Sequence, residues 1–214
     1  MKKLFMAGIL GAILVFGANL VFSKNQSGQN VQNYVLSLPK QPLSQQEIRD
    51  LMHMREEEKL ARDVYLTLYQ KWGFRIFNNI SQSETWHMQM VKFLIDKYGL
   101  NDPVKNDQVG VFTSSQMAKL YKELVKRGLS NKIEALKVGA LIEDLDIYDL
   151  DEAIKKSDNT DINFVYSRLR TGSTNHMRAF IGWLTTYGVT YKPQYISQEE
   201  FNIIIQQKRG GKRW

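Results

Sequence analysis

The stretch SQQEIRDLMHMREEEKLARDVYLTLYQK, residues 44–71, predicts a long amphipathic helix. Ser44 and Glu47 match a capping box, in which a serine and a glutamate three residues later satisfy the free N–H groups at a helix start. Apolar side chains then recur with helical periodicity at Leu51, Met54, Leu60, Val64, Leu68 and Tyr69. Gly73 is expected to end the helix, because glycine readily adopts the left-handed conformation found there. Three consecutive glutamates, residues 56–58, lie in the middle of this helix.

The rest of the chain predicts further helices, because its apolar residues do not alternate as they do in strands. We expect long helices at about 75–97, 130–150 and 161–187, and short ones at about 114–126, 151–156 and 198–207. Gly172 lies inside the fourth long helix, where glycine costs roughly 1 kcal/mol relative to alanine. We therefore expect a packing or ligand reason for this glycine, or a kink. The predicted fold class is all-α, with four long helices over residues 44–188 and short helices in the connections.

The N-terminal residues 1–23 have the pattern of a targeting segment. Lys2 and Lys3 precede a run, residues 4–22, that is apolar apart from one asparagine, and this order is typical of export signals. The run is also just long enough to span a bilayer, so a cleaved signal peptide and an uncleaved anchor both fit. The two lysines favour a cytoplasmic N-terminus, which puts the body outside the cytoplasmic membrane, secreted or anchored. Residues 24–43 are predicted to be a polar linker.

The formal net charge of +7 is concentrated at the two ends of the chain. The basic residues that nearly account for it are Lys2, Lys3, Lys208, Arg209, Lys212 and Arg213. The body between them is close to balanced, so we expect no nucleic-acid partner. Residues 189–214 are predicted to be a basic C-terminal tail, either solvated and frayed or in contact with an anionic surface.

Histidine and carboxylate side chains on the long helices predict a buried metal site. Glu84 and His87 form a Glu-x-x-His step, and residues three apart share one face of a helix, so both can point at one ion. The other long helices offer Glu58, Glu143, Asp146 and His176. Because the chain has no cysteine, any metal must be held by oxygen and nitrogen, a donor set that suits iron, manganese or zinc. In four-helix carboxylate proteins, two helices each give a Glu and two give Glu-x-x-His.

The three consecutive glutamates cannot all face the core, since neighbours on a helix differ by about 100° in direction. Glu58 lies seven residues after Leu51 and therefore near the apolar face, with Glu57 as its competitor. Glu57 is expected to face solvent and to pair with His53, one turn earlier. Tyr65 is seven residues after Glu58 and is a candidate hydrogen-bond partner for the ligands.

Three segments carry a resemblance to the ferritin-like superfamily: residues 56–65 (EEEKLARDVY), 139–146 (GALIEDLD) and 172–176 (GSTNH). Residues 58–65, and residues 76–80 followed by 83–87, are similar to the first and second ligand helices of rubrerythrins. The stretch from about 43 to 187 resembles a domain-of-unknown-function branch of that superfamily. The resemblance implies a ferritin-like four-helix bundle with a non-haem di-metal centre, and the ligands carried over are Glu58, Glu84, His87, Glu143 and His176.

One position departs from the ferritin-like pattern, which has Glu three residues before the second histidine. This chain has Ser173 before His176. Asp146 is the candidate replacement, as an extra glutamate on the third helix is in rubrerythrins. Without it the site is asymmetric or holds a single metal ion.

The resemblance implies two non-haem metal ions, iron first and manganese or zinc as alternatives. It also implies an oxidoreductase of ferroxidase or peroxidase type, acting in iron oxidation or in O₂ or peroxide reduction. A separate electron donor is expected, because the chain has no cysteine-based relay, and a homodimer is one candidate assembly. The alternative is a non-enzymatic metal-binding bundle, or a structural or interaction bundle, at the cell envelope.

Overall fold

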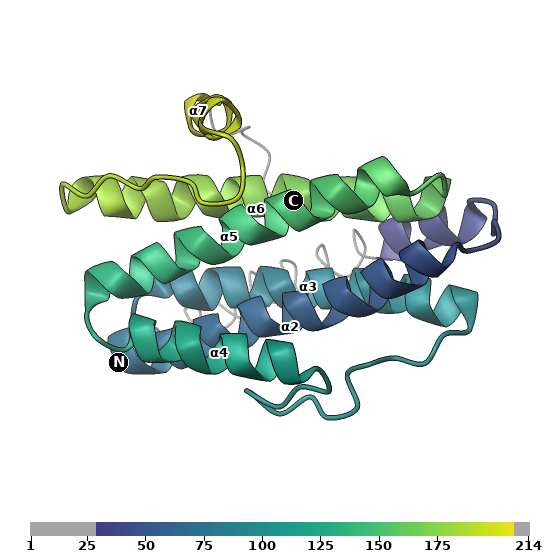
Figure 1. The fold of residues 1–214 in the computed structure, drawn as a ribbon, viewed down its shortest axis with the longest axis horizontal. Helices are drawn as coiled ribbons and strands as arrows, with labels where there is room; N and C mark the ends of the chain where they lie inside the picture. Colours follow the sequence, from purple (N-terminus) through teal and green to yellow (C-terminus); the bar gives the residue numbers. More distant parts are fainter. Residues whose placement is uncertain (1–28, 208–214) are drawn as a thin grey trace, which may run out of the picture. The chain divides into compact units, whose positions relative to one another are not determined.

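The structure is a computed structural model that describes residues 29–207 (Figure 1). The predicted leader or anchor, residues 1–23, and the basic residues of the last seven positions lie outside this range. Between residues 29 and 207, no helix combines the length and hydrophobicity that a membrane crossing requires. Of the described residues, 39–207 form one compact unit, and residues 29–38 belong to a second unit.

Part of the predicted linker is helical. Residues 29–37 form a helix, in which the Ser37 hydroxyl donates to the Tyr34 carbonyl at 2.7 Å. The predicted linker over 24–43 therefore contains a helix at these residues. Two of these residues, Gln29 and Gln32, favour a helix, because glutamine has a high helix propensity.

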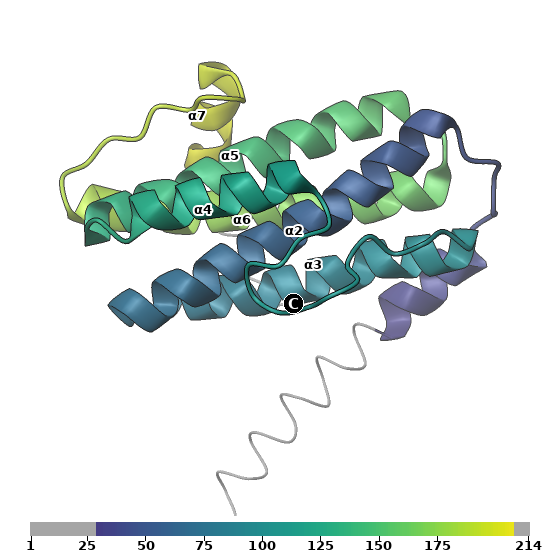
Figure 2. The same ribbon diagram turned by 60° about the horizontal axis from the view of Figure 1, so that its bottom comes forward.

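The compact unit is all-helical over its described residues, as predicted. Its elements are α2 (Gln45–Trp72), α3 (Arg75–Tyr98), α4 (Ser115–Gly128), α5 (Lys132–Lys156), α6 (Thr160–Thr186) and α7 (Gln198–Gln206). The long helices form two pairs, α2 with α3 and α5 with α6, and the pairs meet through contacts of α2 with α5 and of α3 with α6 (Figures 1 and 2). Helix α4 packs on α2 and α5, and α7 packs on α6.

The predicted ends of α2 are confirmed. Ser44 and Glu47 form both bonds of the capping box, at 3.1 Å and 2.8 Å. Gly73 ends the helix with φ 67°, and its N–H donates to the Tyr69 carbonyl at 2.8 Å. The helices predicted at 130–150 and 151–156 are one continuous helix, α5, because Asp151 does not interrupt it.

Two devices hold the interior in place. Three aromatic rings, Tyr65, Phe77 and Phe180, pack with centroids 5.5–6.1 Å apart and join α2, α3 and α6. At Gly139, a Cβ would stand 2.3 Å from the Phe180 ring, so the absence of a side chain lets α5 approach α6. These rings lie next to the buried carboxylates, because the hydroxyl of Tyr65 hydrogen-bonds the carboxylate of Glu143.

The connection between α3 and α4, residues 99–114, is tied to the charged run of α2. Four side chains of α2 bind it: Arg55 pairs with Asp102 at 3.1 Å, Lys59 donates to the Gln108 carbonyl at 2.8 Å, Arg62 pairs with Asp107 at 2.7 Å, and Glu56 accepts from the Thr113 N–H at 2.6 Å. The run EEEKLARD is therefore buried and not solvated: one face of α2 holds this connection, and the other turns its carboxylates inward.

The segment after α6, predicted as a tail from residue 189, belongs to the compact unit as far as it is described. Asp144 is fully buried and accepts hydrogen bonds from the Tyr191 hydroxyl at 2.8 Å and from the backbone N–H groups of Gln194 and Ile196 at 2.5 Å and 3.0 Å. The carboxylate of Asp144 thus anchors the return of the chain to α5, which the sequence did not signal.

Candidate metal centre

The five candidate ligands carried over from the family resemblance come together between the long helices. They are Glu58 on α2, Glu84 and His87 on α3, Glu143 on α5 and His176 on α6, and all are buried. Each long helix contributes at least one of them, although the residues are up to 118 positions apart in the chain. Their role as ligands remains a prediction, but their convergence is a feature of the fold.

These residues form two groups that can each hold a metal ion. In the first, Nδ1 of His87 lies 3.2 Å from Glu58 and 2.7 Å from Glu84. In the second, Nδ1 of His176 lies 2.9 Å from Glu84 and 3.3 Å from Glu143. Within each group the candidate ligand atoms lie within 4.8 Å of one another. Each group thus offers one imidazole nitrogen and two carboxylate oxygens.

Glu84 belongs to both groups and connects them. Its Oε2 faces His87 and its Oε1 faces His176, so one carboxylate presents one oxygen to each side. The two imidazole rings are 5.7 Å apart, centroid to centroid, and inclined by 28°. A carboxylate placed between two similar ligand groups is suited to bridging two ions.

Several ligand atoms of this cluster lack a hydrogen-bond partner among the described residues. They are Oε1 of Glu58, Oε1 of Glu84, Oδ1 of Asp146 and Nδ1 of His176. A buried polar group without a partner costs on the order of 1–3 kcal/mol, and more when it is charged. Two of these four atoms, Oε1 of Glu84 and Nδ1 of His176, form an ion pair at 2.9 Å. Oε1 of Glu58 and Oδ1 of Asp146 are the oxygens that stay available to a further ligand.

Burial sets the electrostatics of the cluster. It raises the pKa of Glu58 to about 8 and also raises the pKa of Glu143, because a buried carboxylate loses its hydration. Burial would raise the pKa of Glu84 as well, but the neighbouring His176 and His87 outweigh it and lower that pKa. The shared carboxylate is therefore the one most firmly held in its ionised form.

Tyr65 hydrogen-bonds a candidate ligand, as predicted from its position on α2. Its hydroxyl donates to Oε1 of Glu143 at 2.5 Å, so its partner comes from α5 and is not Glu58 of its own helix. Burial, together with the charges of Glu143 and Glu84, raises the pKa of Tyr65 well above its ordinary value. The phenol therefore stays protonated and acts as a donor to this carboxylate.

Asp146 and Ser173 form a pair beside the cluster. The Ser173 hydroxyl donates to Oδ2 of Asp146, and both side chains are buried. Asp146 does not belong to either three-residue group, but burial and the nearby Glu58 and Glu57 raise its pKa well above the ordinary value. Its position next to the cluster fits an extra ligand, and Ser173 orients it.

A further group of potential ligands, His53, Glu57 and Asp149, lies between α2 and α5. Glu57 is 3% exposed, so the expectation that it faces solvent was wrong. The reason is that α5 covers this part of α2. Asp149 was not predicted from the sequence, because its partner His53 is 96 residues away.

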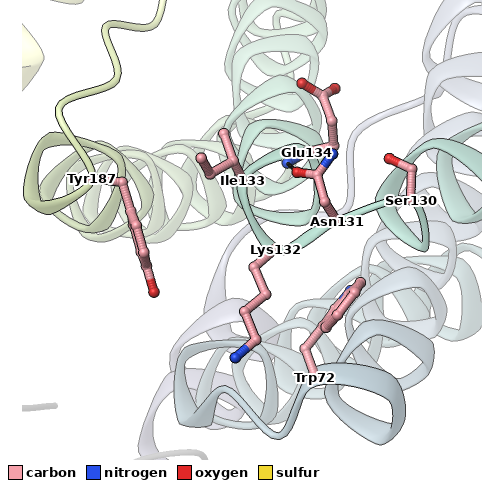
Figure 3. A pocket seen from close by; sticks show the side chains of 7 residues that line it. All are labelled: Trp72, Ser130, Asn131, Lys132, Ile133, Glu134 and Tyr187. Atoms are coloured by element: carbon pink, nitrogen blue, oxygen red, sulfur yellow. Dashed lines mark hydrogen bonds between the residues drawn. The ribbon is translucent and has the colours of Figure 1, made fainter.

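A surface hollow of about 620 Å³ lies between the end of α2, the start of α5 and the end of α6 (Figure 3). Its lining residues are Trp72, Ser130, Asn131, Lys132, Ile133, Glu134 and Tyr187, which come from the ends of α2 and α6 and the start of α5. None of the candidate ligands lines it, so it is separate from the metal-ligand cluster.

Comparison with known proteins gives the family of the chain. The family model described as "Uncharacterized protein domain (DUF2202)" matches residues 47–208. The chain is 59% identical over 172 residues to "Uncharacterized protein MJ0754" of Methanocaldococcus jannaschii, a match that covers 80% of this chain and 93% of that protein. It also matches the crystal structure of hypothetical protein MJ0754 with a TM-score of 0.79 at 58% identity, over 80% of this chain and 98% of that one. The chain therefore belongs to the DUF2202 family.

Proposed function

We propose that this protein is a ferritin-like four-helix bundle that holds two non-haem iron ions and acts in iron oxidation or in the reduction of O₂ or peroxide. The observation that carries the proposal is the position of Glu84, which is shared by two buried groups of one histidine and two carboxylates each. This arrangement matches the ligand pattern of four-helix carboxylate proteins except at Ser173, which stands where the pattern has a second glutamate, three residues before His176.

The residues present fit such a centre. Carboxylate oxygen and imidazole nitrogen are donors that iron accepts, with manganese and zinc as competitors. Glu58, Glu84 and His87 would hold one ion, and Glu84, Glu143 and His176 the other. A metal-free bundle is a poorer account, because well-packed apolar residues of similar volume are often neutral or stabilising in place of buried charges. Without a metal ion, the buried Oε1 of Glu58 would also keep the cost of its lost hydration.

The residues around the centre have separate tasks. Tyr65 fixes the carboxylate of Glu143 by donating a hydrogen bond to it, which is how ligands are commonly held in orientation. Ser173 holds Asp146 in the same way. The aromatic cluster of Tyr65, Phe77 and Phe180 keeps water away on one side of the cluster. Bound iron supplies the redox chemistry.

In iron oxidation, Fe²⁺ itself supplies the electrons. Repeated reduction of O₂ or peroxide would need a separate donor, because the chain contains no cysteine for an iron–sulfur or rubredoxin-type relay. We further propose that the protein acts outside the cytoplasmic membrane. Lys2 and Lys3 followed by an apolar run support this location. Fractionation of cells that express the full chain tests it directly, and recovery of the protein only from the cytosol would contradict it.

The decisive experiment is the iron content of the full chain, purified without a histidine tag after aerobic iron loading and measured by plasma mass spectrometry. We expect about two iron ions per chain, and their loss in a His87→Ala, Glu143→Ala double variant. Glu56→Gln is the matched control, because Glu56 is buried on the same helix as Glu58 but binds the 99–114 connection.

The possible results distinguish a two-ion centre, a one-ion centre and a metal-free bundle. Two ions that the control retains would justify assays of iron oxidation and peroxide reduction. One ion per chain would show that Ser173 leaves half of the centre without a sufficient ligand set. A folded protein without metal would contradict the proposal and leave a structural bundle.

A further inference from the structure

A second cluster of metal-ligating side chains lies between α2 and α5, apart from the five residues of the proposed centre. Nε2 of His53 is 3.4 Å from Oε2 of Glu57 and 3.4 Å from Oδ2 of Asp149. The three candidate ligand atoms lie within 4.8 Å of one another. The side chain of His53 is 44% exposed and that of Glu57 only 4%, so the cluster leads from the surface into the interior.

The ion pairs within this cluster leave it incomplete. Oε2 of Glu57 is buried and lacks a hydrogen-bond partner among the described residues, although it is the atom that faces His53. With both carboxylates ionised, the three groups carry a net charge of −1 if the imidazole is protonated and −2 if it is neutral. A single exposed imidazole thus does not neutralise the two carboxylates, one of which has lost its hydration. A divalent cation would neutralise both carboxylates and bind to Oε2 of Glu57.

The cluster is connected to the proposed centre by carboxylates. Glu57 is adjacent to Glu58 in the chain. On α5, Glu143, Asp146 and Asp149 follow one another at intervals of three residues and therefore along one side of the helix. Acidic side chains thus occur at successive turns of α5 between the exposed cluster and the buried one.

We propose that His53, Glu57 and Asp149 form an outer divalent-cation site through which metal ions enter the protein on their way to the buried centre. Binding at the outer site depends on these three residues alone. The role in entry rests on the function proposed above. One imidazole and two carboxylates leave coordination positions for water, which suits a site that binds an ion and then releases it.

The test uses Co²⁺ with the full chain after removal of metal by chelation. Bound ions per chain are counted by equilibrium dialysis and plasma mass spectrometry, and located by anomalous diffraction at the cobalt edge. The outer site is removed by His53→Gln and Asp149→Asn, which change exposed or half-buried side chains and leave the buried Glu57 in place. Glu152→Gln is the matched control, because it removes a surface carboxylate one turn further along α5 that pairs with Lys155.

A variant that lacks the buried centre shows whether the outer site binds metal independently of that centre. In a Glu84→Gln, His87→Gln variant, which removes ligands of the buried centre, we expect one Co²⁺ ion per chain to remain between His53, Glu57 and Asp149. Addition of Asp149→Asn should weaken its binding at least about tenfold. Retention of the ion after this change, or no ion at this position in the anomalous map, would overturn the outer site whether or not the centre binds metal.

Entry is tested by the rate at which Fe²⁺ loads the otherwise intact chain. We expect His53→Gln and Asp149→Asn to slow loading about tenfold, since a cleft of one charge sign raises the local concentration of its counter-ion. Final iron content should be unchanged, and Glu152→Gln should load at the original rate. Equal loading rates in all variants would overturn the entry role, even if the outer ion is present.

Discussion

The backbone of Gly172 on α6 lies against the imidazole of His87 on α3. A Cβ at position 172 would stand 2.5 Å from Nε2 and 2.7 Å from Cε1 of this ring. The ring cannot move away freely, because Nδ1 is held by Glu84 at 2.7 Å and Glu58 at 3.2 Å. The expected packing reason for a glycine in mid-helix is therefore confirmed: it makes room for a candidate ligand.

Gly172→Ala should weaken metal binding and destabilise the fold. The methyl group would gain about 1 kcal/mol of helix propensity, but overpacking against a buried ring costs about 1–3 kcal/mol. Iron content and the free energy of unfolding measure both effects. Gly182→Ala on the same helix is the control, because nothing lies within 4 Å of its Cβ position, and it should stabilise the protein slightly. Equal behaviour of the two variants would refute the packing account.

Tyr65→Phe should lower the free energy of unfolding by about 1–2 kcal/mol, because Glu143 would lose the donor at 2.5 Å inside the protein. Metal affinity should fall about tenfold or more, as it does when a residue that orients a ligand is removed. Urea unfolding and metal titration check the two effects. Tyr166→Phe is the control: this phenol is equally buried but its hydroxyl lacks a partner among the described residues, so the change should be neutral or stabilising.

Lys59→Met should destabilise the protein by about 3 kcal/mol or more, because it leaves Asp63 with one fewer cation in a fully buried position. It also removes the hydrogen bond from Lys59 to the Gln108 carbonyl, so hydrogen exchange in residues 99–114 should accelerate. Lys92→Met removes a lysine–aspartate pair of the same i,i+4 spacing that is exposed, and should cost below about 1 kcal/mol. A similar loss in both variants would contradict the structural role of Lys59.

Stability should fall in acid through Glu47, which joins the start of α2 to the turn before α6. Burial alone would raise the pKa of Glu47, but hydrogen bonds from Asn159, Ser157 and Ser44 outweigh it and lower the pKa below the ordinary 4.5. A lowered folded-state pKa stabilises the protein fully above about pH 4.5, and this contribution disappears as the pH falls through the folded value. Urea unfolding between pH 3 and 7 measures it.

Glu47→Gln should remove this part of the pH dependence and lower the stability at pH 7. The matched control is Glu123→Gln, since Glu123 is an exposed carboxylate on α4. The assignment to Glu47 fails if its variant retains the full acid slope.

The local features of the chain were predictable because they depend on residues only a few positions apart. The capping box at Ser44, the glycine end at Gly73 and the helical periodicity between them decided α2. The same applies to Glu84 and His87, whose spacing places both on one face of α3 wherever that helix packs. The helix break predicted near residue 151 does not occur. Apolar periodicity alone does not show whether two neighbouring helical segments form one continuous helix.

What only the tertiary structure decided are the partners of each charged side chain. Helical geometry allowed either Glu57 or Glu58 to be buried. Both are buried, because α5 covers Glu57 and α3 approaches Glu58. The contacts of Asp149 with His53 and of Ser173 with Asp146 join residues 96 and 27 positions apart, and no local pattern encodes such distances. By itself the sequence determined which helices form and which residue types they carry. Packing decided which carboxylates lose their hydration, and therefore where a bound cation would compensate for that loss.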